Sequence, residues 1–158
     1  MVTPTNQLRD AAHKPDWARF TRLAGDHAAI LFEDLRGRVS RIDGLREELF
    51  YHAPEGAERT DPGNRADWGW APRYRIGQAT LFSVFIRPGA LEGVMTLESP
   101  LCERLLGSAR IAARIKEAIQ SAPSEAGVVT LRLPLRNVSD VRSFANLVIL
   151  KSKAVAAR

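Results

Sequence analysis

The residues best suited to ligand chemistry occur in the stretch WGWAPRYRIG, at positions 68–77. Arg73 and Arg75 alternate there with aromatic residues, as expected of a strand whose successive side chains point to opposite faces. Two neighbouring guanidinium groups can hold a carboxylate or a phosphate group. We therefore predict a binding site for a small anionic ligand or a protein partner, and its candidate residues are Trp70, Arg73, Tyr74 and Arg75 with Glu47, Phe50 and Tyr51 from the preceding segment.

The same alternation is also typical of an ordinary half-buried strand, whose aromatic side chains carry a large free energy of burial. On this interpretation Trp68, Trp70 and Tyr74 belong to the core, and small neighbours leave room around the arginines on the other face. The long loop at 53–67 offers carboxylates that could neutralise both arginines. The sequence favours a core role for the aromatic side and leaves the cationic side open between a ligand platform and structural ion pairs.

Other groups capable of chemistry do not form a recognisable constellation. The three histidines, His13, His27 and His52, lack the short spacing of metal ligands, and no glycine-rich phosphate loop is present. Cys102 is the only cysteine, so an internal disulfide is excluded and a buried apolar role is favoured. The pair Glu47–Glu48 is interpreted as surface charge. We predict no cofactor and no metal site, and the sequence leaves enzyme activity open while favouring a non-catalytic protein.

The net charge of +5 raises nucleic acid as an alternative partner. The excess lies in residues 80–158, which carry 11 Lys+Arg against 6 Asp+Glu, but it is scattered rather than clustered. A nucleic-acid footprint gathers its cations on one face, so nucleic acid is the less favoured partner. The residues that would carry this alternative are Arg104, Arg110, Arg114, Lys116 and Arg132.

Hydrophobic periodicity supplies the elements that must position these side chains. Helical spacing predicts a helix from Asp26, acting as its cap, to about Asp43–Gly44. Alternation predicts a meander of strands whose central member is the most buried. The fold class is therefore α+β, a single antiparallel sheet of four to five strands with helices packed on one face. The predicted strands are 68–76, 79–87, 91–98 and 127–135, with LREELFY as a fifth strand or a helical turn, and the later helices are 109–121 and 138–152.

The chain is long enough for one complete core. We expect an N-terminal arm and short helix over residues 1–24, a single α+β domain over 25–152 and a C-terminal tail over 153–158. The longest apolar run is far shorter than the roughly 20 residues that cross a bilayer, and no secretory signal is recognised. We therefore expect no membrane association and a cytoplasmic location, while the oligomeric state, including a homodimer, stays open.

The order of several segments resembles the domain of unknown function 3788 family over about residues 25–151. The resembling segments are GDHAAILFEDL, EELFY, GWAPRYRIGQATLF, a GxLEG turn, IAARIKEAIQSA and RLPLRNVSDVRSFANLVILK. Two departures are the long segment at 53–67 and the additional residues 1–24. The resemblance implies a small bacterial or archaeal α+β protein and brings no activity with it.

Overall fold

The computed structural model describes residues 7–53, 69–87 and 90–157, and this part of the chain forms one antiparallel sheet with helices. The six strands lie in the order β1-β2-β3-β4-β6-β5, and every neighbouring pair is antiparallel. The strands are β1 (Leu45–His52), β2 (Gly69–Ile76), β3 (Ala79–Arg87), β4 (Ala90–Glu98), β5 (Ser124–Glu125) and β6 (Val128–Leu135).

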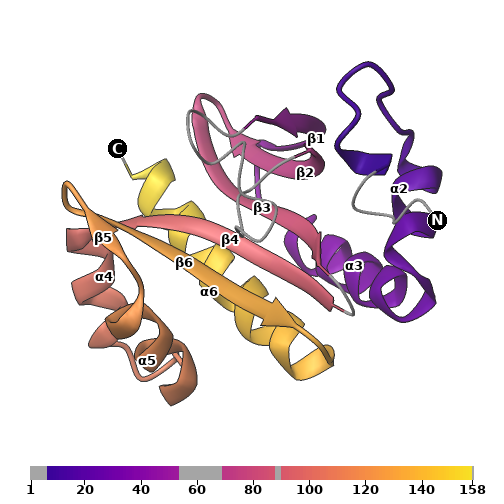
Figure 1. The fold of residues 1–158 in the computed structure, drawn as a ribbon. Coiled ribbons are helices and arrows are strands. Elements are labelled where there is room, and N and C mark those ends of the chain that lie inside the picture. The colour runs from indigo at the N-terminus through magenta and orange to yellow at the C-terminus, as the bar shows by residue number, and fades with distance from the viewer. Residues whose placement is uncertain (1–6, 54–68, 88–89, 158) are drawn as a thin grey trace.

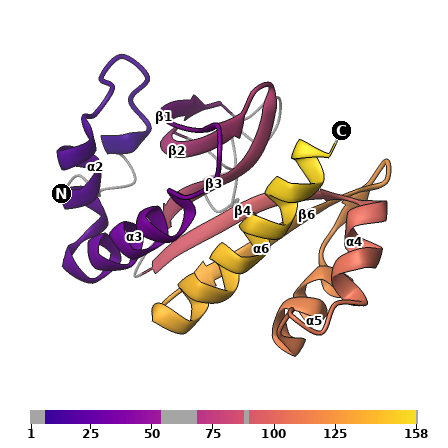
Figure 2. The same cartoon turned by 180° about the vertical axis from the view of Figure 1, so that it is seen from behind.

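Helices cover one face of this sheet (Figures 1 and 2). In Figure 2, α3 and α6 lie in front of the strands, while α4 and α5 lie at the end formed by β5 and β6. The predicted α+β class, with one antiparallel sheet, is confirmed. The helices are α2 (Trp17–Ala24), α3 (Asp26–Val39), α4 (Ser99–Leu106), α5 (Ala113–Ser121) and α6 (Val138–Ala156).

The alternation of side chains along β4 and β6 explains how the sheet receives its helices. Leu91, Met95 and Leu97 of β4 are buried and belong to the main core, as are Leu131 and Leu133 of β6. The intervening side chains point to the opposite face, which we call the outer face, because successive residues of a strand alternate. One face of each strand therefore packs against the helices.

Gly93 lets α6 approach β4 closely. A Cβ placed at Gly93 would lie 2.5 Å from Cζ of Phe144, which is a fully buried residue of α6. Any larger residue at this position would displace the aromatic ring, so glycine fixes how closely the helix packs on the sheet.

The strand β3 is buried on both faces, as predicted for the centre of the meander. On the helix side, Phe82 stacks on Tyr74 with ring centroids 4.3 Å apart and meets the Phe144 ring edge-on at 5.4 Å. On the outer face, Phe85 forms a small cluster with Ala71 and Val94. Pairing of β2 with β3 and of β3 with β4 confirms the predicted meander.

Three features of the fold differ from the sequence prediction: the number of strands, the end of the first long helix and its N-cap. The sheet has six strands rather than four to five, because LREELFY is strand β1 and the two residues of β5 add a short edge. The first long helix, α3, ends at Val39 rather than near Asp43–Gly44. Its N-cap is Gly25, with no side-chain cap, so the predicted capping role of Asp26 is wrong.

The later helices are also shifted from their predicted bounds. The helix predicted at 109–121 begins only at Ala113 (α5), and the last helix extends beyond residue 152 to Ala156. Asn137 caps α6, because its side-chain oxygen accepts a hydrogen bond from the Asp140 backbone N–H at 2.9 Å. Trp68 and the loop carboxylates at 55–67, which the sequence interpretation used, lie outside the described residues.

The described part of the N-terminal segment packs onto the domain. Leu8 and Phe20 are buried in the same core cluster as the sheet residues. The carbonyl oxygen of Arg9 accepts a hydrogen bond from the Tyr51 hydroxyl at 2.7 Å, and that of Asp10 accepts one from Trp70 Nε1 at 2.9 Å. Residues 8–10 are therefore tied to β1 and β2.

Candidate functional site

The seven sequence-predicted site residues fall on two faces of the sheet. Phe50, Arg73 and Arg75 lie on the outer face, where both arginines contact Glu48. The other four lie on the helix side, as their contacts with helix α3, the N-terminal segment and the core show; they are Glu47, Tyr51, Trp70 and Tyr74. The structure therefore does not bring the seven residues into one site.

On the outer face, Glu48 occupies the guanidinium groups that were predicted to hold an anion. Arg73 donates to Glu48 Oε1 through Nε at 2.8 Å and Nη2 at 2.6 Å, and its guanidinium lies 3.5 Å from the Phe50 ring centroid. Arg75 Nη1 lies 3.5 Å from the same oxygen. The Arg73 hydrogen bond lowers the pKa of the Glu48 carboxyl, so Glu48 is ionised at neutral pH. An anion arriving here must compete with a resident carboxylate.

A second glutamate repeats this arrangement farther along the outer face. Glu92 of β4 lies 3.2 Å from Arg87 Nη2 and 3.5 Å from Arg132 Nη1. Cross-strand neighbours on one face of a sheet stand close enough for such pairs to form directly. The cations of β2, β3 and β6 on the outer face are thus paired by glutamates of β1 and β4.

On the helix side, Glu47 joins the core to α3. Its Oε2 accepts from the Tyr74 hydroxyl at 2.7 Å and from Arg36 Nε at 2.9 Å, and its Oε1 accepts from Arg36 Nη2 at 2.7 Å. Burial, followed by the hydrogen bond to Glu47, raises the pKa of Tyr74 far above its usual value of 10.0. Tyr74 is therefore a permanent hydrogen-bond donor, and this network fixes β1 against the helix.

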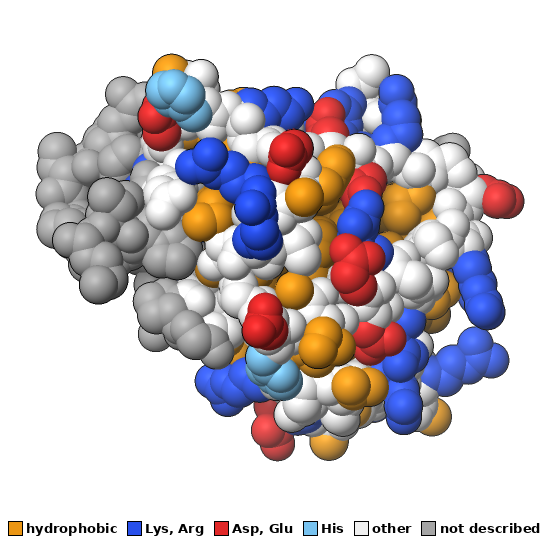
Figure 3. All heavy atoms as spheres, turned by 90° about the vertical axis from the view of Figure 1, so that its right-hand side faces the viewer, with side chains coloured by type: hydrophobic (Ala, Val, Ile, Leu, Met, Phe, Trp, Pro, Cys, Tyr) orange, Lys and Arg blue, Asp and Glu red, His pale blue; other side chains and the backbone are white. Residues whose placement is uncertain are grey.

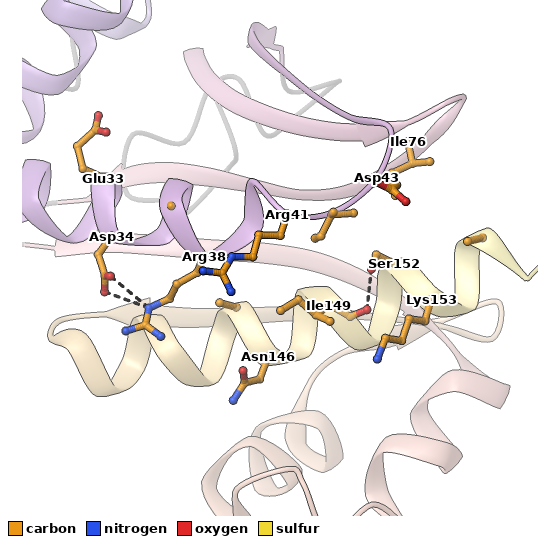
Figure 4. A pocket seen from close by; sticks show the side chains of 14 residues that line it. Glu33, Asp34, Arg38, Arg41, Asp43, Ile76, Asn146, Ile149, Ser152 and Lys153 are labelled. Atoms are coloured by element: carbon orange, nitrogen blue, oxygen red, sulfur yellow. Dashed lines mark hydrogen bonds and ion pairs between the residues drawn. The ribbon is translucent and has the colours of Figure 1, made fainter.

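A concavity lies between α3 and α6. The two helices begin together, where His27 Nε2 donates to the Arg136 carbonyl oxygen at 2.9 Å. Toward their C-terminal ends lies a groove with a volume of about 810 Å³, which we call the α3–α6 groove (Figure 4). Its lining residues are Glu33, Asp34, Gly37, Arg38, Arg41, Ile42, Asp43, Ile76, Ala145, Asn146, Ile149, Ser152, Lys153 and Ala156.

Polar side chains of the groove differ in whether they have partners. Arg38 Nε is held by Asp34 along α3 at 3.2 Å, as the dashed lines of Figure 4 show. Four other polar side chains have no hydrogen bond or ion pair within the described part of the chain; they are Arg41, Asp43, Asn146 and Lys153. Ile42, Ile76 and Ile149 add apolar surface beside them. A concave site with apolar walls and a few convergent polar groups is the usual form of a small-molecule site.

Sequence reasoning did not find this groove, because residues more than a hundred positions apart line it. The helix was predicted to continue through Arg41 and Asp43, which in the structure belong to the connection between α3 and β1. One signal was present on α6, where Asn146, Ile149 and Lys153 follow at i, i+3 and i+7 and thus share a helix face.

The five cations of the nucleic-acid alternative do not form one surface. Arg114 of α5 pairs with Asp140 at the start of α6, whereas Arg132 lies on the outer face with Glu92. The sheet separates these two positions. On the face over α2 and α3, Figure 3 shows acidic and basic side chains interspersed, with apolar side chains between them. Arg114 and Arg132 therefore do not share the single surface on which a nucleic-acid footprint gathers its cations.

The described residues include neither a cluster of metal ligands nor an activated thiol. No group of three or more His, Cys, Asp or Glu side chains within 7–53, 69–87 and 90–157 is placed to hold a metal ion. Cys102 is buried in α4, and burial raises the pKa of its thiol above the usual 9.0. A thiolate nucleophile at neutral pH is therefore disfavoured.

Among the helices of the described chain, none has the length and apolarity needed to cross a bilayer.

Comparison with known proteins adds no relative, since no protein-family model, curated protein or solved structure matches this chain.

Proposed function

We propose that this protein is a non-catalytic binding module whose α3–α6 groove holds a small ligand by its anionic group. The observation that carries the proposal is that Arg41 and Lys153 line one concavity, with neither side chain paired in the described residues. Exposed cations are commonly hydrated by water alone, so the lack of a protein partner for Arg41 and Lys153 is not by itself evidence of a site. Their position beside Ile42, Ile76 and Ile149 in a groove of ligand size is what supports binding.

The groove suits an anion that also has an apolar part. A carboxylate can accept from the planar fork of Arg41 and from the Lys153 ammonium, one on each wall. An aliphatic group can cover the isoleucine side chains, which stabilises binding by about 25 cal/mol for each Å² removed from water. Neither contact requires displacement of an existing ion pair, in contrast to the outer face.

The sequence-predicted residues remain a second proposed location for an anion or a protein partner. Phe50 is exposed on the edge strand β1 with Arg73 stacked on it, which favours a partner surface there. The pairing with Glu48 favours the groove for a small anion. We also retain as proposals the resemblance to the domain of unknown function 3788 family and a cytoplasmic location, which a single buried cysteine supports.

Titration with isocaproate, a branched aliphatic carboxylate, tests the groove. We expect saturable binding by isothermal calorimetry or NMR titration. The double substitution Arg41→Ala, Lys153→Ala should weaken it at least about tenfold, which corresponds to the loss of about 1.4 kcal/mol.

The matched control is Arg104→Ala, Lys116→Ala, which removes the same charge from α4 and α5, where neither side chain lines the groove. The affinity of this control for isocaproate should be within about twofold of that of the parent protein. Equal weakening in both double variants would show a non-specific effect of net charge, and the proposal would be wrong.

A further inference from the structure

We infer that the α3–α6 groove selects a zwitterion, an α-amino acid with a branched aliphatic side chain. This inference rests on the proposed function, because the ligand carboxylate is assigned to Arg41 and Lys153. It adds a separate role for Asp43, which would accept hydrogen bonds from the ligand ammonium group.

The groove presents opposite charges that do not neutralise one another. Asp43 belongs to the connection between α3 and β1, whereas Lys153 belongs to the last turn of α6. Both line the same cavity, yet no ion pair or hydrogen bond joins either of them to another described residue. In Figure 4 they lie on the two walls of the groove. A ligand carrying both charges could satisfy both groups at once.

The overall charge of the lining is balanced. Three basic residues, Arg38, Arg41 and Lys153, line the groove together with three acidic ones, Glu33, Asp34 and Asp43. A ligand with net negative charge therefore gains little long-range attraction, whereas a neutral zwitterion gains the two local contacts without net repulsion. The outer face differs, because Glu48 and Glu92 there each lie between two arginines.

The cost of removing water from Asp43 would let the groove discriminate leucine from isocaproate. A ligand that fills the groove removes water from Asp43, and a carboxylate that loses water without gaining a donor is costly. Isocaproate would leave Asp43 without such a donor, whereas leucine, which adds only an ammonium group to the same skeleton, would provide one. Sites built around a polar contact reject analogues that lack it. Ile42, Ile76 and Ile149 match the aliphatic side chain.

Three probes of one skeleton test this inference on the full chain. L-leucine has both charges, isocaproate lacks the ammonium group and isoamylamine lacks the carboxylate. We expect leucine to bind at least about tenfold more tightly than either analogue, the factor that one charge-assisted hydrogen bond supplies. Equal binding of leucine and isocaproate, or of leucine and isoamylamine, would overturn the inference.

Substitution Asp43→Asn assigns the effect to one side chain. In this variant leucine should lose its advantage and bind about as isocaproate does. Glu103→Gln, an exposed position on α4 outside the groove, is the control and should keep the full preference. An unchanged preference in Asp43→Asn would contradict the role of Asp43.

The isocaproate titration distinguishes the proposed anion-binding function from the inferred preference for a zwitterion. Binding of isocaproate that depends on Arg41 and Lys153, with no advantage for leucine, would preserve the proposed function and refute the zwitterion. Binding of leucine well above isocaproate, lost in Asp43→Asn, supports both. Absence of binding by all three probes would refute the inference and remove the support for the groove.

Discussion

The outer face of the sheet and the α3–α6 groove use the same charged residue types in different ways. On the outer face, Glu48 and Glu92 each lie between two arginines, and Arg73 also stacks on Phe50. In the groove, Arg41, Asp43 and Lys153 face a shared space without a partner in the described residues. These four arginines of the outer face are therefore already paired, whereas the groove still has contacts to offer.

The spacing of secondary structure explains this difference. Directly opposed residues of paired strands, such as Glu48 and Arg73, have Cβ atoms about 5 Å apart. Diagonal neighbours remain within reach of long side chains, so Glu92 also meets Arg87 and Arg132. Helices pack with axes about 8–10 Å apart, and past the His27–Arg136 contact a groove remains between α3 and α6. Residues on the two walls are thus separated by a gap. A cluster of charges is a better ligand site where its own neighbours cannot neutralise it.

The largest expected effect compares the two faces of β3. Phe82→Ala should lower the free energy of unfolding by about 4 kcal/mol, because Phe82 contacts Tyr74 and Phe144 in the main core. Phe85→Ala should cost about 3 kcal/mol, because its outer-face cluster is small. Chemical denaturation measures both. A greater loss for Phe85→Ala would show that the outer face contributes more to stability than the helix side.

A smaller loss of unfolding free energy is expected from the helix-side hydrogen bonds that join Tyr74, Glu47 and Arg36. Tyr74→Phe removes a buried hydroxyl that donates to Glu47, while Glu47 keeps its two contacts with Arg36. We expect a loss of about 1–2 kcal/mol by thermal or chemical denaturation. Full stability of Tyr74→Phe would mean that this hydrogen bond contributes nothing net, and the contrast with the exposed pairs of the outer face would disappear.

The outer-face ion pair should contribute less, and with a defined pH dependence. The Arg73 hydrogen bond lowers the pKa of Glu48 below its usual 4.5, so its stabilising contribution is present above that value and is lost as the pH falls through the folded-state pKa. Because the side chain is 41% exposed, Glu48→Gln should cost only about 0.5 kcal/mol at neutral pH. The parent–variant difference should vanish as the pH falls through the lowered folded-state pKa of Glu48. A difference that grows on acidification would contradict the ion pair.

The smallest change in stability is expected in the groove. Arg41→Ala, Lys153→Ala removes two side chains without partners in the described chain, so the free energy of unfolding should change by no more than about 0.5 kcal/mol. A loss above about 2 kcal/mol would show that these cations already stabilise the fold, and the contrast between groove and outer face would fail.

Local alternation predicted the sheet better than the site. The period-two pattern identified β2, β3, β4 and β6, because one face of each strand must be buried. It also predicted that Arg73 and Arg75 share a face, as their common contact with Glu48 shows. It could not show that Glu47 and Glu48 point to opposite sides, since LREELFY was compatible with a helical turn.

Long-range geometry decided the rest. Nothing local in the sequence places Arg41 opposite Lys153, because their proximity follows from how α3 and α6 pack on the sheet. The predicted end of α3 was late because Arg41 and Ile42 continue its polar and apolar pattern past Val39. Short elements such as β5 have too few residues to show a period.

Mapping of isocaproate by backbone-amide NMR tests the central claim most directly, because one titration reports on both regions. We expect saturable shift changes around the groove, at Gly37, Arg41, Ile149 and Lys153, and little change at Phe50, Arg73 and Arg75. Changes concentrated at Phe50, Arg73 and Arg75, with the groove unaffected, would contradict it and return the anion to the outer face of the sheet.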